Sequence, residues 1–195
     1  SHRALVFGSI SIDKIVNKYG SYSDVLGGSA SYALLATKKK ECQIVGMVGN
    51  DFSKEHFTLL GEHSINLEDL KIEQGNTFAW GGEYADDFST RETLYVNPGV
   101  SEKYEPVLSQ NSKNCEYLLL GNTHPHLQLT LLNQIESKPF VILDTFKLYM
   151  DIAKSELKKI ISKSNLLCIN YNEAIHLCGL KNPNLEDMAK YILDM

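Results

Sequence analysis

The sequence predicts an α/β fold built on a mostly parallel sheet, and three observations support this. Short apolar runs alternate with segments of helical periodicity along the 195-residue chain, a pattern typical of βαβ units. Hydrophobic residues make up 43% of the chain, which is enough for a sizeable core. Two aromatic segments interrupt the alternation and predict a small projecting β-sheet. We therefore expect a single three-layer α/β/α domain over residues 3–195 with a β-sheet lid.

The apolar runs predict the strands of the main sheet, and the periodic segments between them predict the helices. Strands are expected near Ala4–Ile10, Cys42–Val48, Tyr117–Leu120, Phe140–Leu143 and Leu166–Ile169. Helices are expected directly after Gly28, then over Ser53–Glu62, Asn122–Glu136 and Ile152–Ser162, with a further helix running from about residue 172 to the end of the sequence. The apolar stripe of Ile152–Ser162 consists of Leu157, Ile160 and Ile161, which are spaced to lie on one helix face.

The lid is expected at about residues 11–19 and 75–97. Phe78, Trp80 and Tyr84 stand at even spacing, which places them on one face of an extended strand. A small sheet cannot bury an aromatic face by itself. We therefore expect a homodimer in which the lids pack on each other, with a hairpin packed on the core as the alternative.

Composition excludes several classes of function. The net charge of −5 argues against a nucleic-acid partner, because neutralising phosphates requires a basic surface. No apolar run approaches the roughly 20 residues that span a bilayer, and no signal peptide precedes the first strand, so we expect no membrane partner and a cytoplasmic location. The four cysteines are widely spaced and lie in or beside apolar runs, which predicts buried free thiols.

Two groups of residues have the chemistry of a polyol-binding site. Gly27 and Gly28 let the backbone approach a polar ligand closely, and the following helix start offers N–H donors to hydroxyl groups. Asp13 lies after the first strand, where its carboxylate can accept two hydroxyl hydrogen bonds. The structural alternatives are a tight turn at the glycines and a turn-forming role for Asp13.

Other side chains extend this site. Asn122 and Asp144 follow predicted strands, and open α/β sheets bind ligands at the carboxyl ends of their strands. Trp80 and Tyr84 offer apolar faces to a sugar ring or a nucleoside base, unless they serve core or dimer packing. Arg91, the only arginine of the lid, either reaches an anionic substituent or is solvated.

Three ordered stretches together resemble the ribokinase-like (PfkB) carbohydrate kinases. They are Leu5–Asp13, the segment from Gly27-Gly28 through Ile44–Asp51, and Asn170-Tyr171-Asn172-Glu173, which resembles the family's Asn-x-x-Glu motif. The resemblance covers roughly the N-terminal two-thirds of such a kinase. It implies the ribokinase-like fold, ATP and Mg²⁺ as cofactors, and transfer of the γ-phosphoryl group to a hydroxyl of a small-molecule sugar.

The resemblance also assigns roles to individual residues. It implies that Asp13, Gly27, Gly28 and Ser31 bind substrate, and that Asn170 and Glu173 serve the nucleotide cofactor, with Glu173 holding Mg²⁺ through water. The alternative for the last pair is structural: Asn170 caps the next helix and Glu173 lies at its positive end.

The sequence departs from the family pattern at three points. Ser31 stands where asparagine is common, Lys147 stands where asparagine often follows the Asp144-Thr145 pair, and no Gly-Ala-Gly-Asp segment follows Glu173. We therefore expect no catalytic residue in this chain, and we expect the chain by itself to be inactive. On this expectation it is either a truncated product or part of a longer protein. A nucleoside kinase is the second candidate. A non-catalytic sugar-binding or dimerisation module is the third, if the truncation is natural.

Overall fold

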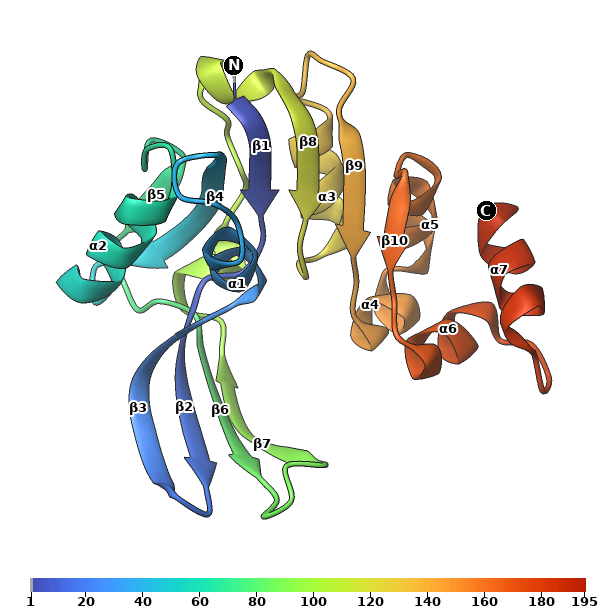
Figure 1. The fold of residues 1–195 in the computed structure, drawn as a ribbon, viewed down its shortest axis with the longest axis horizontal. Coiled ribbons are helices and arrows are strands. Elements are labelled where there is room, and N and C mark those ends of the chain that lie inside the picture. Colours follow the sequence, from blue (N-terminus) through green and yellow to red (C-terminus); the bar gives the residue numbers. More distant parts are fainter. Residues whose placement is uncertain (1) are drawn as a thin grey trace.

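The main sheet of the protein is fully parallel. The computed structural model describes residues 2–195, and Figure 1 shows a six-stranded sheet with helices on both faces. The strand order is β10-β9-β8-β1-β4-β5, and every neighbouring pair is parallel. The strands are β1 (His2–Phe7), β4 (Cys42–Gly49), β5 (Leu70–Glu73), β8 (Cys115–Leu120), β9 (Phe140–Asp144) and β10 (Leu166–Cys168). Their carboxyl ends all meet at one edge.

Alternation along β1 divides the core into two layers. Leu5 and Phe7 belong to one buried cluster and Val6 to the other, because successive side chains of a strand point to opposite faces. The first cluster includes residues of α3 (Pro125–Leu132) and α5 (Lys154–Ser162), and the second includes residues of α1 (Ser29–Leu35) and α2 (Lys54–His63). The three-layer α/β/α class predicted from the sequence is confirmed.

The remaining helices lie toward the carboxyl-terminal end of the chain. They are α4 (Lys147–Ile152), α6 (Tyr171–Cys178) and α7 (Leu185–Leu193). Two short 3₁₀ turns, Gly99–Lys103 and Gln110–Lys113, lie between β7 and β8. The expectation of one helix to the end of the sequence is wrong. Gly179 takes a left-handed φ of 61° that ends α6, and Asn184 then caps α7. The helix expected at Ile152–Ser162 is found as α5, which starts at Lys154 because α4 ends at Ile152.

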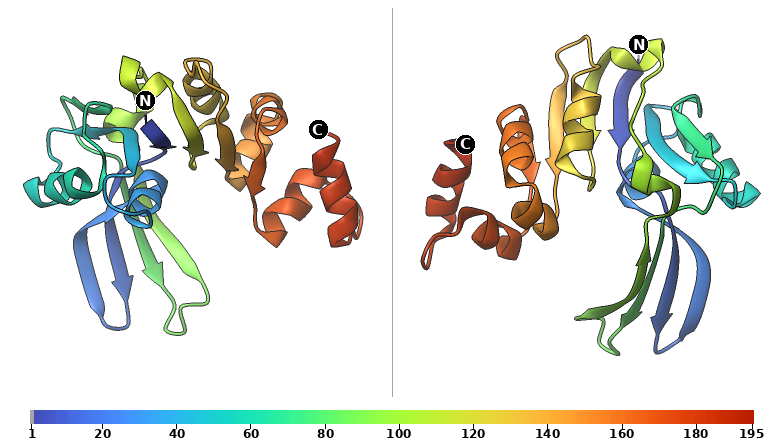
Figure 2. Two further views of the ribbon diagram at one scale, coloured as in Figure 1. Left: turned by 45° about the horizontal axis from the view of Figure 1, so that its top comes forward. Right: turned by 180° about the vertical axis from the view of Figure 1, so that it is seen from behind.

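A second sheet projects from the carboxyl edge of the main sheet and forms the lid. Figures 1 and 2 show its strands extending away from the α/β body. The strands are β2 (Ser11–Asn17), β3 (Gly20–Gly27), β6 (Ala79–Tyr84) and β7 (Arg91–Asn97), in the order β3-β2-β6-β7. The β2–β6 pair is parallel and the two outer pairs are antiparallel. A carboxylate of the body holds the chain where it enters β6: Asp51 Oδ1 accepts from Thr77 N (2.8 Å) and Thr77 Oγ1 (2.6 Å).

The lid differs from the sequence prediction in two respects. Strand β3 was not predicted, and it supplies one edge of the sheet. A bulge leaves Leu94 unpaired, because Gly81 pairs with Tyr95 while Gly82 pairs with Thr93. Thr93 and Tyr95 therefore lie on opposite faces, contrary to simple alternation.

Strand β5 of the main sheet, which has only four residues, was also missed.

Two further expectations can be compared with the structure. Cys42, Cys115 and Cys178 are buried, but Cys168 is exposed on the edge strand β10, so the expectation of four buried thiols is wrong for that residue. Over the described residues, no helix combines the length and the apolar character needed to cross a membrane.

Candidate functional site

The start of α1 lies against the loop that follows β1. Ser29 N donates to Ser9 Oγ (3.1 Å), Ser9 N donates to Ser29 Oγ (3.2 Å), and Ala30 N donates to the Ser9 carbonyl (3.0 Å). These bonds use two N–H groups of the helix start that the sequence analysis left free for ligand hydroxyls. That expectation is therefore wrong for Ser29 and Ala30: the donors anchor the helix to the strand end instead.

At each residue of the glycine pair, Gly27 and Gly28, a different steric contact excludes a side chain. Gly28 has a φ of 96°, and a Cβ there would lie 2.3 Å from the Ser9 carbonyl oxygen. At Gly27 a Cβ would lie 2.0 Å from Asp13 Oδ2. The close approach predicted for these glycines is thus made by the chain itself, and the second of these contacts brings the Asp13 carboxylate against the Gly27 backbone.

Asp13 is a buried carboxylate on the lid. The residue is 9% exposed, and its Oδ1 accepts a hydrogen bond from Ser11 Oγ at 2.7 Å. Burial raises the pKa of Asp13, while the Ser11 hydrogen bond and the charge of Arg91 oppose the rise. A carboxylate has about four acceptor positions, so Asp13 keeps acceptor capacity beyond Ser11. A partly desolvated acceptor of this kind suits ligand hydroxyl groups.

The carboxyl ends of β8 and β9 are joined by a helix side chain that sequence reasoning missed. Gln128 of α3 is 1% exposed, and its Nε2 donates to the carbonyls of Gly121 (2.9 Å) and Asp144 (3.1 Å). Gly121 N in turn donates to the Phe7 carbonyl at 2.6 Å. Asn122 therefore starts from a fixed backbone and is half-buried. A single glutamine in a helical pattern carries no signal that identifies such a role.

Asn170 and Glu173 form a capping box at the start of α6. Asn170 Oδ1 accepts from Glu173 N (2.9 Å), and Glu173 Oε2 accepts from Asn170 N (3.1 Å). The structural alternative raised from the sequence is thus realised, with the helix beginning at Tyr171. The box uses one carboxylate oxygen and the amide oxygen, which leaves the other Glu173 oxygen for a ligand.

Asp144 lies within electrostatic range of Glu173. Cys168, two residues before Asn170, pairs with Asp144 across β10 and β9. Burial raises the pKa of Asp144, the bond from its own neighbour Thr145 N opposes the rise, and the charge of Glu173 adds to it. Two carboxylates at adjacent strand ends, one of them desolvated, are a donor set suited to Mg²⁺ with retained waters. Within residues 2–195, no group of three or more His, Cys, Asp or Glu side chains could hold a metal ion.

Buried polar atoms without a partner gather in this region. Four side-chain oxygens have no hydrogen-bond partner within the described chain: Ser31 Oγ, Thr123 Oγ1, Gln128 Oε1 and Thr145 Oγ1. Thr123 and Thr145 follow β8 and β9, and Gln128 connects these strand ends. Ser31 is in α1, which follows the lid strand β3. Most buried polar groups in proteins are hydrogen-bonded, so the three oxygens at the ends of β8 and β9 leave hydrogen-bonding capacity unused at the carboxyl edge. Ser31 is 1% exposed, whereas Lys147, at the start of α4, is exposed.

Comparison with solved structures identifies the fold. The chain matches the apo structure of a putative ribokinase II from E. coli with a TM-score of 0.80, at 15% identity, over 100% of this chain and 70% of that one. The same protein in complex with ATP and Mg²⁺ gives 0.76 at 15% identity, again over 100% and 70% of the two chains. A nucleoside kinase of the ribokinase family from Methanocaldococcus jannaschii gives 0.70 at 17% identity, over 98% and 68%. The resemblance to ribokinase-like proteins is thus confirmed for the fold.

These matches rest on structure. No protein-family model and no curated protein sequence matches the chain. The chain corresponds to about two thirds of the length of the structures that it matches.

Proposed function

We propose that the protein is an ATP-dependent kinase of the ribokinase type that transfers the γ-phosphoryl group to a hydroxyl of a carbohydrate. The observation that carries the proposal is Asp13: a buried carboxylate on the lid, held by Ser11 and placed against Gly27 at the carboxyl edge of the sheet. The solved structures that the chain matches include a protein named a putative ribokinase II, which was also solved in complex with ATP and Mg²⁺.

In this proposal each group has a physical task. Asp13 accepts hydrogen bonds from substrate hydroxyls and fixes their orientation toward the carboxyl edge, and charged acceptors make the stronger bonds. Gly27 lies directly beside Asp13, and Gly28 and Ser31 continue the site from there, while Asn122 and Asp144 bound it at the ends of β8 and β9. Glu173, which the capping box with Asn170 positions, holds the Mg²⁺ of the nucleotide through water. When bound, Mg²⁺ neutralises charge on the phosphates.

A nucleoside kinase is the second candidate. The matched archaeal protein is named a nucleoside kinase, and Tyr84, which is only partly buried in the lid, offers an aromatic ring to a base. The third candidate is a sugar-binding module without catalysis. This candidate predicts ligand binding without phosphoryl transfer by these 195 residues.

We also propose that the lids pair in a homodimer. The lid leaves several large apolar side chains exposed in the single chain: Tyr19, Tyr22, Phe88, Leu94, Tyr95 and Val96. The three aromatic residues that the sequence analysis expected a partner to cover, Phe78, Trp80 and Tyr84, are already partly buried by their own chain. Tyr19 and Phe88 stack at the tip with ring centroids 6.2 Å apart, so the two lid hairpins support each other there.

Substrate profiling tests these proposals. Purified protein is incubated with ATP and Mg²⁺ and with panels of sugars and nucleosides, and ADP formation is measured beside calorimetric binding of the same compounds. Transfer to sugars supports the leading proposal, and transfer to nucleosides supports the second. Because the 195-residue chain is expected to be inactive by itself, binding without transfer is compatible with all three proposals, and the class of compound that binds then distinguishes sugar from nucleoside. Transfer by these residues would contradict the third proposal, and the absence of both binding and transfer would contradict all of them.

A further inference from the structure

Arg91 is held on the face of Trp80 in the lid. Its Cζ lies 5.0 Å from the centroid of the Trp80 ring, which is a cation–π contact. The ring reaches this position by lying over Gly82, where a Cβ would come within 2.0 Å of the ring atom Cη2. A glycine two residues after the tryptophan thus leaves room for the indole to lie along the strand. The arginine head group is therefore pre-positioned.

Arg91 lies on the same face of the lid as Asp13. Asp13 pairs with Trp80 across β2 and β6, and Tyr84 pairs with Arg91 across β6 and β7. Trp80 and Tyr84 are an even number of residues apart along β6, so their side chains and those of their cross-strand partners share one face. The charge of Arg91 also opposes the rise in the pKa of Asp13 that burial causes. The two groups therefore lie on one face of the lid and within electrostatic range of each other.

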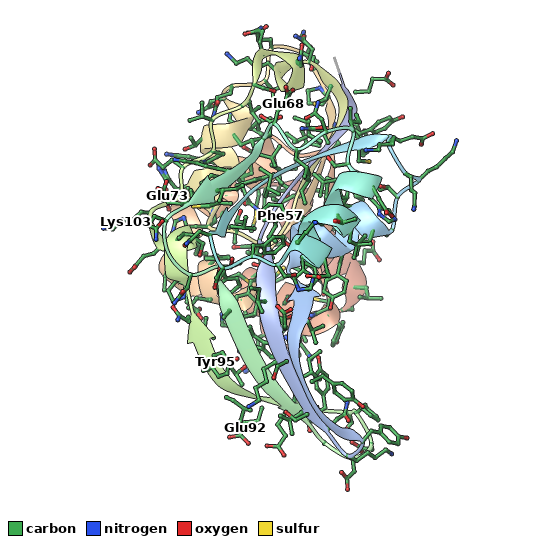
Figure 3. All side chains as sticks on the ribbon, turned by 90° about the vertical axis from the view of Figure 1, so that its left-hand side faces the viewer. Phe57, Glu68, Glu73, Glu92, Tyr95 and Lys103 are labelled. Atoms are coloured by element: carbon green, nitrogen blue, oxygen red, sulfur yellow. The ribbon has the colours of Figure 1, made fainter. Side chains whose placement is uncertain are left out.

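The acidic side chains of the neighbouring strand positions lie on the other face. Glu83 pairs with Glu92, and Gly81 pairs with Tyr95; Figure 3 labels Tyr95 and Glu92 along β7. A Cβ at Gly81 would meet the Tyr95 ring at 2.3 Å, whereas a Cβ at Gly82 would meet the Trp80 ring. Adjacent residues of a strand point in opposite directions, so Tyr95 and Trp80 mark opposite faces. Among the described residues, none forms an ion pair with Arg91.

We infer that Arg91 binds an anionic group of the substrate, so that the substrate is a polyhydroxylated compound bearing a phosphate or a carboxylate. The inference rests on the proposed function and specifies its substrate class. A guanidinium fork matches both oxyanions with two parallel hydrogen bonds, while Asp13 accepts hydroxyls and repels a nearby anion. The face thus has one site for hydroxyls and a second site, at Arg91, for negative charge. A neutral sugar uses only the first of these sites.

The test compares three forms of one sugar. Calorimetry of the 195-residue chain with glucose, glucose 6-phosphate and glucuronate measures binding to ligands that share a ring and differ in one group. At least one anionic form should bind roughly tenfold more tightly than glucose, because it adds a charge-assisted contact, and added salt should reduce that gap. The phosphate and carboxylate forms distinguish the two sources of the anion.

Variants locate the effect. Arg91→Gln should abolish the preference, so that neither anionic form binds more tightly than glucose, and Arg91→Lys should keep part of it because the charge remains. Lys14→Gln is the matched control, since Lys14 pairs with Gly81 and lies on the face opposite to Arg91.

The outcomes separate this inference from the proposed function. Equal affinity for glucose and both anionic forms, or a preference that survives Arg91→Gln, overturns the inference and leaves the sugar site standing. Glucose binding that is unaffected by Asp13→Asn overturns the proposed site. Binding of none of the three compounds by the wild-type chain overturns both.

Discussion

Replacing Asp13 by asparagine separates the role of its charge from its role in the fold. The residue is 9% exposed, and its Oδ1 accepts from Ser11 Oγ at 2.7 Å. Asparagine is nearly the same size and can keep that bond through its amide oxygen. The other carboxylate oxygen, which lies against Gly27, becomes an NH₂ donor. The substitution therefore removes a charged acceptor and leaves the packing nearly unchanged.

The expected loss follows from the hydrogen bonds to the charged group. Such a bond contributes about 1.5–3 kcal/mol, and the amide retains part of the acceptor capacity. We therefore expect sugar binding to weaken by about 1–3 kcal/mol, or roughly 5- to 150-fold in Kd. Calorimetry with the best ligand from substrate profiling measures this, and Asp86→Asn, an exposed position in the lid turn, is the control. An affinity within about twofold of wild type would refute the assignment of Asp13.

The same substitution has a predictable effect on stability. Because burial raises the pKa of Asp13 above its ordinary value of 3.8, the folded protein binds more protons than the unfolded chain between that value and the raised one. Stability from this group therefore falls as pH rises through that window, and the penalty is complete above it. Asp13→Asn should remove the penalty, so its Tm should equal that of wild type in acid and exceed it at neutral pH. A lower Tm at neutral pH would show that the charge stabilises the fold.

Three further predictions concern backbone, capping and assembly. Gly28→Ala should destabilise the fold by about 2 kcal/mol or more, because its φ of 96° and a Cβ 2.3 Å from the Ser9 carbonyl oxygen both oppose a side chain. The control is Gly61→Ala in α2, where the nearest contact of a Cβ would be 3.5 Å away. This variant should be neutral or stabilising in the same thermal unfolding experiment. Asn170→Ala and Asn184→Ala should each lower the free energy of unfolding by about 1 kcal/mol, since each removes a capping box. Only Asn170→Ala should raise the Mg²⁺ concentration needed for nucleotide binding. Equal Mg²⁺ dependence of the two variants would show that Asn170 is a purely structural residue. Phe88→Ser should shift a lid-paired dimer toward monomer in sedimentation, because Phe88 is 45% exposed at the lid tip, and a wild-type chain that is monomeric at high micromolar concentration would contradict the pairing.

The sequence by itself determined the fold class and the order of the main elements. Strong apolar runs such as Cys42–Val48 needed no tertiary context, because a strand buried on both faces is apolar at nearly every position. Ser53 and the helix after it were also readable, since a serine cap and a periodic segment are local signals. The short strand β5 had no such signal: three of its four residues are exposed, and it forms because β4 presents an edge to it.

Tertiary structure alone decided how the predicted site residues are used. The helix-start donors of α1 are occupied by Ser9, which only the approach of the β1 loop could reveal. Gln128 acquires its role because α3 packs across the ends of two strands that are adjacent in space. Arg91 and Asp13 share a face through the register of β2, β6 and β7. Such relations depend on contacts between segments distant in the chain, whereas periodicity and capping report only on neighbouring residues.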